Sequence, residues 1–281
     1  MGGLLAVIVM NLQELKVEVV NAIKKAATTV PEYVEGKLKK AYEAEEGVAK
    51  NQIKNILENI KIAKENCVPL CQDTGIVTFH VSIKDLKIDL TSLEKVLREA
   101  VKEATSAVPL RPNAVDPLTR VNSGNNVGEG VPVIYYSSGE RDEIVIHLRG
   151  AGSDNQTFLK IFPPTINKEE VERFIINCTL ENAEKACPPL IIGVGIGGTS
   201  DYSLILSKKA LLDSSDMDDW ERELLRKVNS LGVGPMGLGG KTTALRLKIK
   251  KAYCHTASLP VAVSFNCWAL RTAKISLERF L

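Results

Sequence analysis

The segment Val68-Pro-Leu-Cys71-Gln-Asp-Thr-Gly75, followed by Ile76-Val-Thr-Phe-His-Val-Ser-Ile83, decides the fold class of this 281-residue chain. Proline, aspartate, threonine and glycine in its first half are typical of a loop. Apolar and polar residues alternate in its second half, as expected for a half-buried strand. The segment therefore marks the point at which a sheet-forming pattern begins.

The residues before this segment predict helices. Apolar residues recur at helical spacing from Leu12 to Ile23, and two more helical runs are expected at about 31–46 and 52–65. We therefore expect a helical lead over residues 1–66.

The residues after this segment predict a mixture of strands and helices. Residues 109–132 are loop-rich, with Arg111-Pro-Asn-Ala-Val-Asp-Pro117 and Asn122-Ser-Gly-Asn-Asn126. Helices first, then a mixed sheet with several antiparallel neighbours, predict an α+β fold. We expect one catalytic domain over 1–281, with the helical lead 1–66 and a mixed α/β body 67–281. In the body, helices are expected from Ser92 as N-cap to about 106 and at 167–186, 200–212 and 217–231, and strands at 76–83, 133–136, 144–148, 157–161, 190–195, 245–252 and 261–265.

Composition is that of an ordinary soluble globular protein and points to no nucleic-acid or membrane partner. The chain is 44% hydrophobic and 25% charged, with a net charge of +2 and 5% aromatic residues. No apolar run approaches the ~18 residues of a membrane span. The apolar segment Leu4–Met10 lacks the basic region and cleavage site of a signal peptide. We expect this segment to pack against the fold near the start of the chain. We also expect the protein to be cytoplasmic.

Two glycine-rich stretches resemble nucleotide-binding motifs but fail in context. Gly193-Val-Gly-Ile-Gly-Gly198 has the spacing of a dinucleotide fingerprint, but the acid expected about 20 residues later should end a strand, and Asp213–Asp218 lies between two predicted helices. Gly-Leu-Gly-Gly240-Lys-Thr242 resembles a phosphate loop, yet proline occupies position 235 where glycine is needed. Nucleotide binding remains an alternative, and the loop Asn229–Thr243 is expected to be architectural.

Three of the six cysteines lie in loops beside a strand or helix end. These are Cys71, Cys187 and Cys267. Three separate thiolates could hold three irons of a [4Fe–4S] cluster and leave the fourth iron open to substrate as a Lewis acid. Buried, inert thiols are the ordinary alternative for every cysteine, and are favoured for the other three, Cys67, Cys178 and Cys254.

A zinc site has little support. Cys67 and Cys71 lie four residues apart, but the adjacent side chains of Cys254 and His255 diverge and cannot easily bind one ion. The two other histidines, His80 and His147, fall in strand-like runs and are expected to be ordinary residues.

Six motifs, in this order, resemble the alpha part of class I, iron–sulfur fumarate hydratase and L-tartrate dehydratase, over about residues 11–275. They are Pro69-Leu-Cys71-Gln-Asp-Thr-Gly75, Arg149-Gly-Ala-Gly-Ser153, Ala186-Cys-Pro-Pro189, Gly232-Val-Gly-Pro-Met-Gly-Leu-Gly-Gly-Lys-Thr-Thr243, Cys254-His-Thr-Ala-Ser-Leu-Pro260 and Cys267-Trp-Ala269. The resemblance implies a [4Fe–4S] cluster held by Cys71, Cys187 and Cys267.

The resemblance also implies the substrate-binding residues. Arg111 matches an arginine that grips a substrate carboxylate, a task suited to its planar guanidinium. The other implied substrate contacts are Gln72, Asp73 and the backbone of Gly150 and Gly152, and the candidates for proton handling are Asp73 and His255. The turn departs from the family pattern, because Ala151 stands where the family has a glycine.

The family's longer form carries a second, beta-type region that supplies further arginines, a lysine and a threonine base. This sequence contains no such region, so we expect a beta-type subunit as partner and a small dicarboxylate as substrate. Hydration of fumarate to L-malate is the expected reaction, and L-tartrate dehydration is the alternative within the family. A non-catalytic, cluster-carrying subunit is the alternative from another class.

Overall fold

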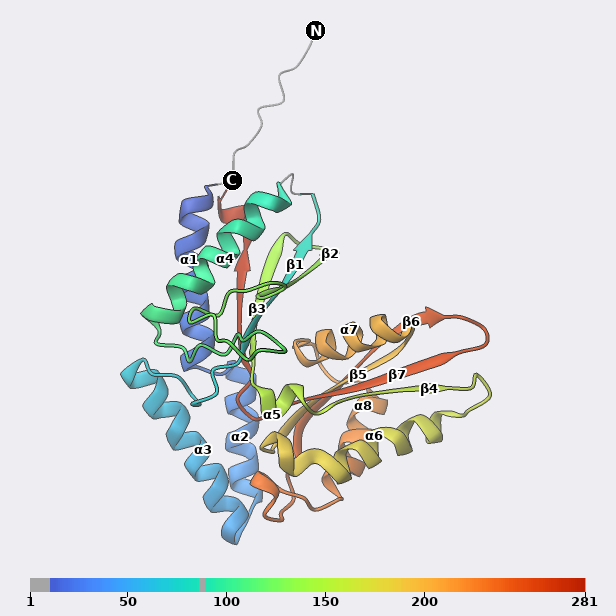
Figure 1. Ribbon diagram of the computed structural model, residues 1–281. Helices are drawn as coiled ribbons and strands as arrows, with labels where there is room; N and C mark the ends of the chain where they lie inside the picture. Colours follow the sequence, from blue (N-terminus) through green and yellow to red (C-terminus); the bar gives the residue numbers. More distant parts are fainter. Residues whose placement is uncertain (1–10, 86–88, 281) are drawn as a thin grey trace. The chain divides into compact units, whose positions relative to one another are not determined.

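The computed structural model describes residues 11–85 and 89–280, and they form an α+β protein (Figure 1). The chain divides into two compact units. Unit 1 contains residues of 1–29, 62–149 and 271–281, and unit 2 contains 30–61 and 150–270. The chain therefore passes between the units four times. The predicted packing segment Leu4–Met10 lies outside the described residues.

Unit 1 is a four-stranded sheet with helices against one face. The strand order is β2-β1-β3-β8, with β1 and β2 parallel and the other neighbours antiparallel. The strands are β1 (Ile76–Ile83), β2 (Val133–Ser138), β3 (Glu143–Arg149) and β8 (Arg271–Ser276), followed by the short η3 (Leu277–Phe280), and the helices are α1 (Leu12–Thr28) and α4 (Leu90–Ala107).

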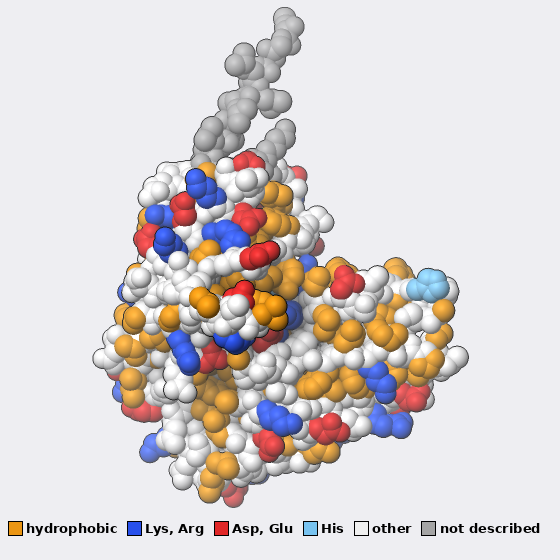
Figure 2. Space-filling view, in the orientation of Figure 1, with side chains coloured by type: hydrophobic (Ala, Val, Ile, Leu, Met, Phe, Trp, Pro, Cys, Tyr) orange, Lys and Arg blue, Asp and Glu red, His pale blue; other side chains and the backbone are white. Residues whose placement is uncertain are grey.

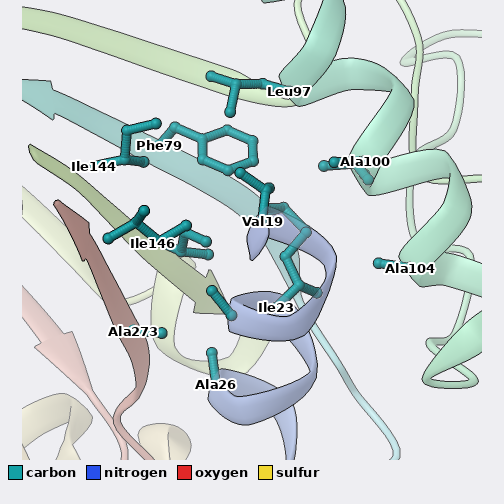
Figure 3. Packing of buried hydrophobic residues seen from close by; sticks show 14 of the residues in the cluster. Val19, Ile23, Ala26, Phe79, Leu97, Ala100, Ala104, Ile144, Ile146 and Ala273 are labelled. Atoms are coloured by element: carbon teal, nitrogen blue, oxygen red, sulfur yellow. The ribbon is translucent and has the colours of Figure 1, made fainter. Parts of the chain in front are cut away.

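The core of unit 1 lies between this sheet and the two helices (Figure 3). Phe79 of β1 and Ile146 of β3 are fully buried in this core. Alanines at Ala26, Ala100 and Ala104 carry little volume, so the helices approach the strands closely. This packing fixes β1, and with it the loop that enters the strand at its amino end.

Unit 2 is also a four-stranded sheet, with strand order β4-β7-β5-β6 and one parallel pair, β5 with β6. Buried side chains of α6 and α8 pack on one face, and α7 lies on the other. The strands are β4 (Thr157–Phe162), β5 (Leu190–Gly198), β6 (Ala244–Cys254) and β7 (Leu259–Asn266), and the helices are α2 (Glu32–Ala44), α5 (Ala151–Asp154), α6 (Lys168–Asn182), α7 (Ser200–Leu211) and α8 (Asp219–Asn229), with η1 (Ala183–Ala186) and η2 (Pro235–Gly237). The helix α3 (Gly47–Asn66) begins in unit 2 and ends in unit 1.

The glycines of β5 are explained by helix packing. A Cβ at Gly193 would lie 2.1 Å from the carbonyl oxygen of Ser207, and one at Gly195 would lie 2.0 Å from that of Ser203, both in α7. Only glycine lets the strand and helix backbones approach this closely. Asp213 lies between α7 and α8, as predicted, and close packing against α7 accounts for the glycines of the fingerprint-like stretch.

The loop before β6 packs closely on itself and against the connection between α2 and α3, and its architectural role stays a prediction. A Cβ at Gly234 would lie 2.0 Å from the carbonyl oxygen of Gly239, so the loop folds tightly on itself. The backbone N–H of Lys241 donates to both carboxylate oxygens of Glu45, at 2.8 and 3.0 Å, and its Nζ binds Glu46. The lysine of the phosphate-loop-like motif is thus engaged by the connection between α2 and α3.

Two local predictions need correction. The N-cap of α4 is Asp89, not Ser92, because the Asp89 carboxylate accepts the N–H groups of Thr91 and Ser92, and the Ser92 hydroxyl donates to it as well. The strand β8 was not predicted. Its sequence Arg271-Thr-Ala-Lys-Ile-Ser276 contains one large apolar residue, and its order comes from pairing with β3. The three leading helices and the other seven strands are confirmed with small shifts of their ends.

No helix within the described residues is both long and apolar enough to cross a bilayer. On the face drawn in Figure 2, Lys and Arg side chains are mixed with Asp and Glu rather than gathered by sign. The absence of nucleic-acid and membrane partners stays a prediction.

Candidate active site

In unit 1, predicted site residues line a hollow of about 310 Å³ beside the loop that precedes β1. Cys71, Gln72 and Arg111 contribute exposed side chains to it. Its remaining lining comes from Pro69, Thr74, Pro109 and Leu110. The structure thus brings a predicted cluster ligand, a predicted substrate amide and a predicted carboxylate-binding arginine together, although Arg111 lies 40 residues from Cys71 in the chain.

Asp73 is held in one orientation by its neighbours. Its Oδ1 accepts the backbone N–H of Gly75 at 3.0 Å and the side-chain Nδ2 of Asn113 at 3.3 Å. Its backbone oxygen accepts Nη1 of Arg271 at 2.5 Å. Because both its side chain and its backbone are bonded, the half-buried carboxylate of Asp73 is placed by the fold.

The backbone of Arg111 is tied to the same loop through Thr74. The Arg111 N–H donates to Thr74 Oγ1 at 3.1 Å, and that hydroxyl donates to the Arg111 carbonyl oxygen at 3.3 Å. Thr74 is buried. The guanidinium remains exposed while the backbone that carries it is fixed, an arrangement suited to binding an anion from solvent.

Gly75 is required by close approach as well as by its backbone angle. It has a φ of +81°, and a Cβ there would lie 2.6 Å from the backbone carbonyl of Arg149. The loop that carries Cys71 and Asp73 can therefore enter β1 only with glycine at this position.

In unit 2, predicted site residues are arranged around α5. The Ser153 hydroxyl of this helix accepts the backbone N–H of Cys267 at 3.1 Å. A Cβ at Gly152 would lie 3.5 Å from the carbonyl oxygen of Lys185, two residues before Cys187. Thus Gly150, Gly152 and the two predicted cluster ligands of unit 2, Cys187 and Cys267, lie around one helical turn. Ala151 opens α5 in helical conformation, so the methyl group that departs from the family pattern is accommodated.

Cys187 and Cys267 each follow the end of an element. Cys187 follows η1 and has a φ of +53°, a left-handed conformation rarely adopted by a residue with a side chain. Cys267 follows β7, and Nδ2 of the buried Asn266 donates to its carbonyl oxygen at 2.8 Å. The left-handed backbone of Cys187 and the hydrogen-bonded backbone of Cys267 restrict the directions in which these two thiols point.

The structure does not bring His255 to Cys267 within the chain. His255 is exposed in the turn between β6 and β7, and Cys267 lies past the other end of β7 (Figure 1). The eight residues of β7 span about 27 Å at ~3.4 Å per residue. The Nδ1 of His255 accepts the Ala257 N–H at 3.1 Å. Its role at an active site stays a prediction.

The donor set fits an iron–sulfur cluster in its chemistry. None of the six cysteines, all of which lie within the described residues, forms a disulfide, and thiolates are the usual ligands of such clusters. One predicted ligand belongs to unit 1 and two belong to unit 2. No three His, Cys, Asp or Glu side chains among residues 11–85 and 89–280 form a preassembled metal-binding group.

The remaining cysteines differ from one another. Burial raises the pKa of the Cys178 thiol to about 12, so this residue stays protonated, as an inert thiol does. Cys67 and Cys254 are exposed, so the expectation that they are buried is wrong. His80 and His147 are buried in the sheet of unit 1.

Sequence reasoning missed Thr74, Asn113 and Arg271 as supports of Asp73 and Arg111. Thr74 lay inside a quoted motif, but its bond to Arg111 joins residues 37 apart. Arg271 lies in the strand that was not predicted. Asn113 lay in the quoted segment Arg111–Pro117, for which the sequence predicted only a loop.

Comparisons with known proteins agree with the resemblance. A family model described as Fumarate hydratase (Fumerase) matches residues 16–276. A protein of Methanocaldococcus jannaschii named "Putative L(+)-tartrate dehydratase subunit alpha" is 44% identical over 270 residues, which cover 91% of this chain and 94% of that protein. The L(+)-tartrate dehydratase subunit alpha of Escherichia coli K12 is 33% identical over 264 residues, covering 90% and 87%.

A longer relative is similar in only part of its length. A protein of Geobacillus stearothermophilus named "Putative fumarate hydratase class I" is 32% identical over 275 residues, which cover 91% of this chain and 53% of that protein. The chain therefore spans about half of this relative.

Proposed function

The chain belongs to the fumarate hydratase (Fumerase) family, a family of hydro-lyases, and on this premise we propose that it is the alpha subunit of an iron–sulfur enzyme that reversibly hydrates fumarate to L-malate. The observation that carries the proposal is the hollow in unit 1, where Cys71, Gln72 and Arg111 meet. A thiol for a cluster and a guanidinium for a carboxylate are the two groups such an enzyme needs.

Cys71, Cys187 and Cys267 are the proposed ligands of the [4Fe–4S] cluster. When bound, the cluster supplies Lewis acidity at the iron that has no cysteine ligand. Support comes from the absence of a disulfide at these three cysteines, all of which lie among the described residues, and from the left-handed backbone of Cys187 and the hydrogen bond from the Cys267 N–H.

The chain's own residues bind and orient the substrate. Arg111 pairs with one carboxylate of the dicarboxylate and fixes its position relative to Asp73. Gln72 offers an amide that can donate to substrate oxygens. The backbone N–H groups of Gly150 and Gly152, at the start of α5, are proposed to donate to a substrate carboxylate. Asp73 and His255 are proposed to handle protons.

A beta-type subunit is the proposed partner, since two of the relatives described above are named subunit alpha. The base that removes the C3 proton is proposed to lie on that partner. A cytoplasmic location stays a prediction.

An anaerobic assay tests the proposal. Purified chain, reconstituted with iron and sulfide, is assayed with malate, fumarate and L-tartrate, alone and with its beta-type partner. We expect fumarate hydration by the pair and little by the chain alone. Full activity of the chain alone would reject the role of the partner. If the pair neither hydrated fumarate nor dehydrated malate or L-tartrate, the proposed function would be rejected.

L-tartrate dehydration is the second candidate. The names of the M. jannaschii and E. coli relatives favour it. Tartrate carries one more hydroxyl group than malate, and a site that binds this group loses affinity for the substrate that lacks it. A kcat/KM for tartrate above that for malate in the same assay would replace the first candidate by the second.

A further inference from the structure

A buried asparagine lies behind the hollow of unit 1. Asn126 ends the segment Asn122-Ser-Gly-Asn-Asn126, which the sequence shows only as a loop. It is 2% exposed and has a φ of +60°, a conformation that asparagine tolerates better than most residues. A buried amide is costly unless its polar atoms are paired. The place of Asn126 therefore depends on its hydrogen bonds.

Each polar atom of the Asn126 amide has a partner. Its Oδ1 accepts the backbone N–H of Asn113 at 2.6 Å. Its Nδ2 donates to Thr105 Oγ1 and to the carbonyl oxygen of Arg111, both at 3.1 Å. The Thr105 hydroxyl lies in α4, so the amide joins a core helix to the two residues that flank Pro112.

Asn113 extends these contacts to Asp73. Its Nδ2 lies 3.3 Å from Asp73 Oδ1 and 3.2 Å from the carbonyl oxygen of Gly75. One side of the Asn126 amide thus holds Arg111, and the other holds Asp73 by way of Asn113. The bonds of Asn126 reach the backbone of Arg111 directly and reach Asp73 through the side chain of Asn113.

We propose that Asn126 is a positioning residue that sets the placement of Arg111 relative to Asp73, and thereby how tightly the site binds a dicarboxylate. The inference rests on the proposed function, which makes Arg111 and Asp73 substrate-binding residues. A side chain that only stabilised the fold would change the melting temperature without acting through Arg111.

The test uses the reconstituted two-subunit enzyme with Asn126→Asp. This variant keeps the size of the side chain and the acceptor for the Asn113 N–H, but places an oxygen where Nδ2 donated to Arg111. Since a buried acceptor then faces another acceptor, we expect the KM for malate and the Kd of succinate, a non-reacting four-carbon dicarboxylate, to rise about tenfold. Iron content should not change. The control Asn21→Asp makes the same change at an exposed asparagine of α1 and should leave both constants unchanged.

A double-mutant cycle with Arg111→Ala separates positioning from general stability. If Asn126 acts through Arg111, adding Asn126→Asp to Arg111→Ala should weaken succinate binding by less than about twofold further. The inference would be overturned if the Kd of succinate in the double variant rose by the product of the two single-variant fold-changes. It would also be overturned if the Kd of Asn126→Asp lay within twofold of wild type.

A second variant keeps the test decisive if Asn126→Asp fails to fold. Asn113→Ala removes the side-chain link to Asp73 and leaves the backbone N–H that Asn126 binds. It should lower kcat more than it raises KM, and unchanged kinetics would overturn the inference. Failure of the proposed function is distinguishable, because the wild-type enzyme would then lack turnover while succinate binding and its dependence on Arg111 and Asn126 remain measurable.

Discussion

At the scale of single residues, the backbone of Arg111 anchors the residue in its loop, and the side chain is left exposed for binding a ligand. Its backbone is bonded to Thr74 and Asn126, and its guanidinium is exposed at the hollow. Replacing the side chain should therefore remove binding without disturbing the loop.

We expect Arg111→Ala to lower kcat/KM for malate because a charge-assisted bidentate pair is lost. The loss of transition-state stabilisation calculated from kcat/KM should be about 2–4 kcal/mol. Steady-state kinetics of the two-subunit enzyme measure this. Arg173→Ala, which removes an exposed arginine of α6, is the control. Near-wild-type kinetics for Arg111→Ala would exclude the carboxylate-binding role.

Cysteine substitutions separate cluster ligands from other thiols. Cys71→Ser, Cys187→Ser and Cys267→Ser should each lower bound iron and the visible absorbance of the reconstituted protein, since a ligand is lost. Cys254→Ser changes an exposed thiol that has no proposed ligand role and should keep both. Equal iron content in all four variants would contradict the ligand assignment.

At the scale of elements, the sequence predicts local patterns well and long-range pairing poorly. The strand β1 was predicted with its observed ends because alternation in Ile76–Ile83 is strong. The strand β8 was missed because pairing with β3, over 120 residues away in sequence, orders it. The candidate site follows the same rule. Motifs identified Cys71 and Asp73, whereas Asn113 and Arg271 are recruited by bonds between distant residues.

Close packing of β5 against α7 gives a matched pair of glycine variants. Gly193→Ala should destabilise the protein by about 3 kcal/mol, because its Cβ would lie 2.1 Å from backbone of α7. Gly36→Ala, in the middle of α2 with no atom near its added Cβ, should stabilise by about 0.5–1 kcal/mol. Urea unfolding measures both, and equal effects would contradict the packing described here.

The turn between α7 and α8 is linked to β6 by Asp213. Burial disfavours its charge, but hydrogen bonds from Lys250 and Ser215 outweigh burial and hold the pKa of Asp213 well below its ordinary value. The carboxylate therefore contributes stability above its unfolded pKa of about 3.9, and the contribution is lost as pH falls through the lower folded pKa.

We accordingly expect Asp213→Asn to destabilise by about 1–3 kcal/mol at pH 7 and by progressively less below pH ~4. Urea midpoints of both proteins across this pH range measure the difference. Asp219→Asn, at a fully exposed carboxylate of α8, is the control and should change little. If the difference in unfolding free energy between wild type and Asp213→Asn grew as the pH fell, the stabilising role of the Asp213 carboxylate would be contradicted.

At the scale of the whole molecule, each unit has its own core, and unit 1 is closed by residues from the end of the chain. Removing residues 271–281 takes away β8 together with the buried side chains of Leu277 and Phe280. We expect β3 to lose amide protection in hydrogen exchange, since it loses a neighbouring strand.

Lys274→Ala provides the control for this deletion, because it alters an exposed side chain and keeps β8 paired. Protection of β3 should remain as in wild type in that variant. Unchanged protection of β3 after the deletion would show that β8 does not stabilise the sheet.

The four passages of the chain between units set an order for events during translation. A ribosome delivers residues 30–61 and 150–270 before it delivers β8, so every strand of the second sheet can pair while the first sheet still lacks its last member. The loop that carries Cys71 gains the hydrogen bond from Arg271 to the carbonyl oxygen of Asp73 only after this last strand has been made, because Arg271 is its first residue. Cluster binding that needs a settled Cys71 loop would then have to follow the synthesis of Arg271.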